Sequence, residues 1–91
     1  MGLLHLSLAI PGARSLKDKR RVIRSLKDRL SGKHNVSVAE VEDLDKHRCC
    51  GMALAMVSND RRFTDSCLSK IVDEIRRERE LTLIEYEIEL I

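Results

Sequence analysis

The chain has 91 residues, of which 43% are hydrophobic and 35% are charged, with one phenylalanine, one tyrosine and no tryptophan. This length supports a single domain, residues 1–91, and the composition is typical of a folded globular protein rather than a disordered one. No apolar run approaches the roughly 20 residues of a membrane-spanning helix, so we expect no membrane association. The three cysteines include the adjacent pair Cys49–Cys50, which favours reduced thiols and a cytoplasmic location.

Positive charge is concentrated in one segment. Between Ala13 and Lys33 there are nine basic residues and two acidic ones, a net charge of +7. From His34 to Ile91 the net charge is −5, so the whole-chain value of +2 conceals a separation of charge. A segregated basic segment is a feature of nucleic-acid-binding proteins, and it also occurs as a simple solvated surface.

The first half of the chain predicts a strand and a helix. Residues 2–10 alternate between apolar and other side chains with a period of two, which predicts a half-buried strand that ends at Pro11–Gly12. Ser15 is a favourable N-cap, and Asp18 three residues later completes a variant of the capping box. The apolar residues that follow share one stripe at about 100° per residue, which predicts an amphipathic helix ending at Gly32.

The second half predicts two strands, a helix and a final strand. Residues 35–44 read as a strand of ambiguous register, because valines occur at both parities, and either a bulge or burial on both faces would explain this. Residues 50–58 form a continuous apolar run typical of a central strand. Residues 59–60 begin a helix that keeps its spacing to about residue 78, and residues 81–91 alternate as the last strand.

The order β-α-β-β-α-β indicates an α+β protein, a ferredoxin-like βαββαβ sandwich. Right-handed crossovers place both helices on one face of a four-stranded antiparallel sheet, with expected strand order 4-1-3-2. The second and last strands are expected at the sheet edges. The glutamates of the last strand either block pairing at its edge, or this strand pairs with a second chain to form a weak homodimer. We expect the core between sheet and helices to comprise Leu4, Leu6, Leu8, Ile23, Leu26, Leu30, Leu54, Ile71, Ile75, Tyr86 and Ile88.

The predicted first helix carries a basic face, within about 120° on the side opposite the apolar stripe. Its members are Lys17, Arg20, Arg21, Arg24 and Lys27, and Arg14 assists from the preceding turn. Long cations without aromatic neighbours suit contact with phosphates, which predicts RNA binding by shape rather than by base readout. The alternatives are a solvated helix face and a protein–protein adaptor that uses this helix or the acidic last strand. Lys19 falls inside the apolar stripe, and we expect its ammonium group to reach solvent.

Three stretches of the chain, IPGARSLKDKR (Ile10–Arg20), NVSVAEV (Asn35–Val41) and VSND (Val57–Asp60), resemble the YlxP-like family. This is a group of small bacterial proteins of unknown function, and the resemblance covers essentially the whole chain. It implies a ferredoxin-like fold and a bacterial cytoplasmic protein. Members are often encoded near translation-initiation and ribosome-maturation genes, so the resemblance also implies an association with RNA or ribosomes. The segment Cys49–Gly51 departs from the residues expected of such a strand.

Recognition of RNA on the open face of the sheet, as in RRM-type proteins, is not supported by the sequence. That mode needs aromatic side chains on which bases stack. The outward positions of the first strand are His5, Ser7 and Ala9, and the last strand adds a row of glutamates that would repel phosphate.

Two other patterns in the sequence bear on metal binding and phosphate chemistry. Asp45, His47 and Cys49 alternate in one loop, but without a second ligand cluster this pattern does not predict a metal site. Arg14 follows the first strand and Asn59 follows the third, as in acylphosphatases, whose glycine-rich loop pattern is missing here. Acylphosphatase-like phosphate chemistry is therefore the third alternative for function. We expect no catalytic residues, no cofactor, no metal and no small-molecule substrate.

Overall fold

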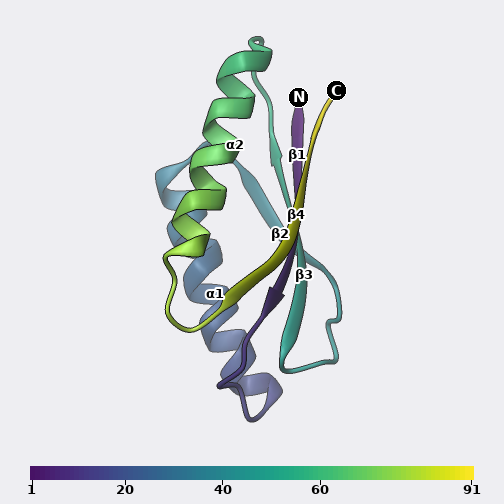
Figure 1. Ribbon diagram of the computed structural model, residues 1–91, viewed down its shortest axis with the longest axis vertical. Coiled ribbons are helices and arrows are strands. Elements are labelled where there is room, and N and C mark those ends of the chain that lie inside the picture. Colours follow the sequence, from purple (N-terminus) through teal and green to yellow (C-terminus); the bar gives the residue numbers. More distant parts are fainter.

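The computed structural model describes residues 1–91 and contains six elements in the predicted order. Figure 1 shows one twisted sheet with both helices on the same side and nothing covering the other side. The strand order is β2-β3-β1-β4 with every pair antiparallel, so the predicted ferredoxin-like α+β fold is confirmed. The elements are β1 (Gly2–Ala9), α1 (Leu16–Lys33), β2 (Ser37–Glu42), β3 (Cys49–Met56), α2 (Arg61–Arg76) and β4 (Thr82–Leu90).

The central strand β1 builds the core by simple alternation. Leu4, Leu6 and Leu8 point toward the helices and are at most 3% exposed, whereas His5 lies on the other face and is exposed. Burial of one face of a strand in this way is the main source of sheet stability. Eighteen hydrophobic residues form the buried cluster, and all of the expected core positions belong to it except Tyr86 and Ile88.

The expectation that Tyr86 lies in the core is wrong. Its side chain is 44% exposed, because β4 is an edge strand and this position lies at the margin of the helical layer. The guanidinium group of Arg76 lies 5.4 Å from the centre of the Tyr86 ring, in cation–π contact. Ile88 is half-buried and packs against the cluster.

Bulges adjust the register of both edge strands. In β2 the pairing shifts between Glu40 and Glu42, which leaves Val41 47% exposed while Val38 packs on the core. Of the two explanations for the ambiguous register of this strand, the bulge is therefore correct. In β4 a similar shift makes Leu83 the partner of Leu8 and leaves Ile84 62% exposed.

The helix ends differ slightly from those predicted. α1 continues through Gly32 to Lys33, and the backbone N–H of His34 donates to the carbonyl of Leu30 at 3.0 Å. α2 begins after Asp60, whose Oδ1 accepts from the backbone N–H of Phe63 at 3.1 Å. Neither helix has both the length and the apolar composition needed to cross a membrane.

Candidate nucleic-acid interface

The start of α1 is fixed by reciprocal capping. The hydroxyl oxygen of Ser15 accepts from the backbone N–H of Asp18 at 3.2 Å, and Oδ2 of Asp18 accepts from the backbone N–H of Arg14 at 2.9 Å. The predicted capping box is therefore present, with its return bond one residue before the cap. The Asp18 carboxylate also lies near the positive end of the helix dipole. These contacts set the rotation of the first turn, and so the direction of every side chain that follows.

The apolar stripe of α1 holds the helix on the sheet. Val22, Ile23, Leu26 and Leu30 are at most 7% exposed, and they lie on the side of the helix that faces the strands. Helical geometry therefore turns the basic face, Lys17, Arg20, Arg21, Arg24 and Lys27, away from the sheet. Four of these residues are exposed, and Lys27 at the margin is half-buried.

Most of the charge on this face has no partner within the protein. The acids of the second half of the chain neutralise the flank of α1 instead, where Arg29 pairs with Glu78 and Lys33 lies 4.0 Å from Glu74. Arg21 lies 3.7 Å from Glu80, and both side chains are more than half exposed, so this ion pair contributes little. No carboxylate oxygen lies within 4 Å of the charged side-chain groups of the remaining cations, which are Arg14, Lys17, Arg20, Arg24 and Lys27.

Two further arginines extend this surface, and the sequence did not reveal either. Arg48, from the loop between β2 and β3, donates through Nε to the carbonyl of Ala13 at 3.4 Å. It is held there because its own carbonyl accepts from the backbone N–H of Ile10 at 2.8 Å. Arg79, from the loop after α2, lines a hollow of about 530 Å³ together with Arg14. Both are exposed, and both lie far in sequence from α1.

The expectation that the ammonium group of Lys19 reaches solvent is wrong. Its side chain is 1% exposed and does not reach solvent. Instead Nζ donates to the carbonyls of Asp43 and Lys46, at 2.7 Å each, and lies 2.6 Å from Oε2 of Glu40. Oε2 forms an ion pair but receives no well-directed hydrogen bond. Lys19 therefore ties the loop between β2 and β3 to α1, and it takes no part in the basic face.

Cys50 lies in the same buried region. Burial, and after it the charge of Glu40, raises the pKa of the Cys50 thiol from 9.0 to about 12, although Lys19 acts in the opposite direction. A thiol with this pKa is almost fully protonated at neutral pH, which makes it a poor nucleophile. The structure thus gives Cys50 a packing role within the core.

The structure does not bring together the residues of the acylphosphatase-like alternative. Because β1 and β3 are antiparallel, Arg14 follows β1 at one end of the sheet and Asn59 follows β3 at the other. No three His, Cys, Asp or Glu side chains converge in a metal-binding arrangement, so Asp45, His47 and Cys49 do not form such a group.

A protein-family model described as "Protein of unknown function (DUF503)" matches residues 1–88. Because the match covers nearly the whole chain, the protein belongs to this family, as expected for a small domain of unknown function. No curated protein matches the chain.

Proposed function

We propose that this member of the family is a non-enzymatic module that binds RNA phosphates through the basic face of α1, with Arg14 assisting from the preceding turn. The observation that carries the proposal is the set of five cations on and beside α1 that have no carboxylate partner. Ion pairing within a protein competes with phosphate for the same cation, so unpaired cations are the ones free to bind RNA. Arg48 and Arg79 widen the surface at the N-terminal end of the helix.

The composition of the surface sets the expected mode of binding. Neutralising phosphates releases condensed counterions, so affinity falls as salt rises. The surface holds arginine and lysine without aromatic side chains, which favours contact with the backbone over stacking on bases. Binding is therefore expected to be salt-sensitive and to depend little on base sequence.

The resemblance to YlxP-like proteins supports a narrower setting for the same proposal. In that setting the protein works in the bacterial cytoplasm, and its RNA is ribosomal or belongs to a particle that assembles with the ribosome. Shape recognition of a structured RNA fits a basic helix face of this kind.

The proposal is tested with the double variant Arg20→Glu/Arg24→Glu and binding measured across a salt series. If all six cations contact phosphates of single-stranded RNA, the slope of log affinity against log salt is about −4 for the wild type. The variant should bind at least tenfold more weakly, with a slope of about −3 or shallower. Both residues are exposed, so its melting temperature should stay close to that of the wild type.

A matched control is Arg61→Glu/Arg62→Glu, which makes the same change in net charge in the first turn of α2. Both arginines are exposed, and neither has an ion-pair partner. This control should keep the affinity and the slope of the wild type to within a few-fold. If both double variants weaken binding equally, net charge rather than the basic face is responsible, and the proposal is wrong.

A further inference from the structure

The face of the sheet that no helix covers, here called the open face, has an unusual composition. Across its middle run Gly51, Ala53 and Ala55 of β3 beside His5 and Ser7 of β1. The glycine is required, because a Cβ there would lie 2.6 Å from Cβ of Glu42 on the neighbouring strand. Small side chains therefore leave the middle of the open face recessed, and this low floor carries a hollow of about 420 Å³.

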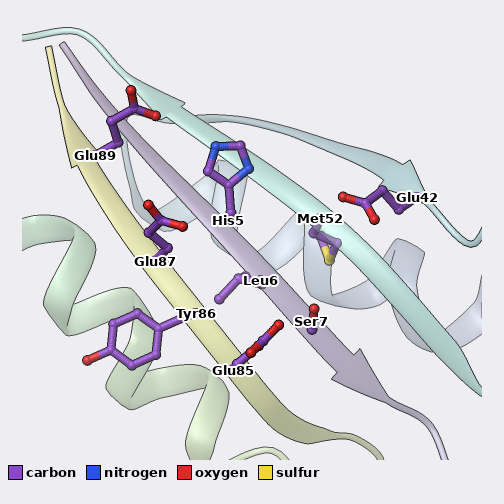
Figure 2. Close-up of a pocket in the computed structure, with 9 residues that line it drawn as sticks. All are labelled: His5, Leu6, Ser7, Glu42, Met52, Glu85, Tyr86, Glu87 and Glu89. Carbon is purple, nitrogen blue, oxygen red and sulfur yellow. The ribbon is translucent and has the colours of Figure 1, made fainter.

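Carboxylates stand on both sides of this hollow. Glu85, Glu87 and Glu89 project from β4 on one side and Glu42 projects from β2 on the other, with His5 between them (Figure 2). All four glutamates are exposed, and none has an ion-pair partner within the chain. The register places Glu87 opposite His5 and Glu85 opposite Ser7, and the open face carries no lysine or arginine on any strand.

The molecule thus has two surfaces of opposite charge that face in opposite directions. α1 lies on the covered side of the sheet (Figure 1). Its apolar stripe packs toward the sheet, so its basic face points away from the open face. Neither surface can neutralise the other within one molecule, and the exposed pair Arg21–Glu80 is the one ion pair that either surface makes within the chain. Complementary potentials of this kind steer association and fix its orientation.

We propose that the open face is a docking surface for the basic face of α1 from a second copy of this chain. The dimensions agree. The cations from Lys17 to Lys27 span about 15 Å at 1.5 Å per residue, and the glutamates from Glu85 to Glu89 span about 13 Å at 3.3 Å per residue. A helix laid along β4 therefore brings its cations level with the row of carboxylates, over a floor low enough to admit long side chains.

This interface joins two different surfaces, so it is heterologous. One copy contributes its helix and the next contributes its sheet. Because the two surfaces face in opposite directions, copies stack in an open chain rather than close into a small ring, which leaves one of each surface free at its two ends. Association is therefore open-ended rather than limited to a dimer, and it weakens as salt screens the charges. It differs from pairing through the edge of β4, which would close as a dimer held by backbone hydrogen bonds.

The test uses two variants, each of which weakens one surface. Glu85→Gln/Glu87→Gln/Glu89→Gln removes the row of carboxylates on β4 and leaves only Glu42 of the four glutamates, and Arg20→Glu/Arg24→Glu reverses two charges of the basic face. In sedimentation velocity at low salt, the mean mass of the wild type should rise with concentration beyond that of a dimer, and high salt should return it to the monomer. Each variant alone should be monomeric, and their equal mixture should form a dimer that does not extend.

The control Asp45→Asn/Asp65→Asn removes exposed carboxylates that lie outside the sheet, and it should associate as the wild type does. A wild type that stays monomeric at low salt would overturn the inference, even if a free arginine-rich peptide bound the open face. So would a dimer that persists in the triple variant, or a mixture that stays monomeric. RNA binding is a separate readout, because the triple variant keeps the basic face and should retain its RNA affinity.

Discussion

Replacing Lys19 by methionine tests the role of the one buried lysine. The substitution keeps an unbranched apolar stem of similar length, so the packing of α1 is retained and the ammonium group alone is lost. It leaves the Glu40 carboxylate, which is 17% exposed, without its cation, and it removes a donor from the carbonyls of Asp43 and Lys46. Breaking a buried ion pair by removing one partner costs about 3–5 kcal/mol.

The structure places the expected loss near the lower end of that range. Asp43 is half-buried and Lys46 is exposed, so water can reach both carbonyls once the loop loosens. We therefore expect Lys19→Met to lower the free energy of unfolding by about 3 kcal/mol. The double variant Lys19→Met/Glu40→Leu should be more stable than Lys19→Met alone, because an apolar pair in place of a buried ion pair is often neutral or better. Measuring Glu40→Leu alone as well completes the double-mutant cycle, which gives the coupling free energy between the two side chains.

Urea unfolding followed by circular dichroism gives these free energies, and hydrogen exchange reports on the loop between β2 and β3. The amide of Lys46, which donates to the carbonyl of Asp43 at 3.1 Å, should exchange faster in Lys19→Met. Lys17→Met is the matched control, since it makes the same chemical change at an exposed position and should cost no more than about 0.5 kcal/mol. If Lys19→Met costs less than about 1 kcal/mol, its ammonium group is solvated and the reasoning is refuted.

Two further substitutions test the core. Leu6→Ala, at a position 3% exposed on the central strand, should cost about 2–5 kcal/mol in urea unfolding, and a cost below about 1 kcal/mol would contradict the register of β1. Because folding raises the pKa of Cys50 from 9.0 to about 12, the folded state holds this proton more tightly. The resulting stability should be complete below pH 9 and lost as the pH rises toward 12, and Cys50→Ala should lack this loss when unfolding is compared across that range.

Periodicity and capping chemistry predicted most of the fold, because both are local. The alternation of β1, the reciprocal bonds of Ser15 and Asp18, and the apolar run of β3 each act within a few residues of sequence. The errors arose where distant parts of the chain meet. Tyr86 alternates correctly for a core residue, but its position on an edge strand places its side chain at the margin of the helical layer, where it is 44% exposed.

The candidate interface could be predicted only in part, because some of its residues lie together on α1 and others come from distant loops. Helical geometry placed the five cations of the basic face on one side of α1 without reference to the rest of the chain. The additions of Arg48 and Arg79 depend on loops that reach the start of α1 only after folding. Lys19 was misplaced because its acceptors are carbonyls of a loop 24 and 27 residues away. Any residue can supply a backbone carbonyl, so no pattern of side chains in the sequence predicts where a buried lysine finds its acceptors.

The pairing of charge across the fold decides what α1 can bind. One flank of α1 is paired with Glu74 of α2 and Glu78 of the loop after it. Glu80 of the same loop makes only the exposed pair with Arg21 of the basic face. The glutamates of β4 lie on the open face, on the opposite side of the sheet from α1, and cannot reach its basic face. The basic face is left to external partners, and RNA phosphates and the open face of a second copy require the same cations. The two proposed interactions are therefore mutually exclusive at any one helix. RNA should dissociate assemblies of the protein, and within an assembly most of the basic faces should be covered and unable to bind RNA.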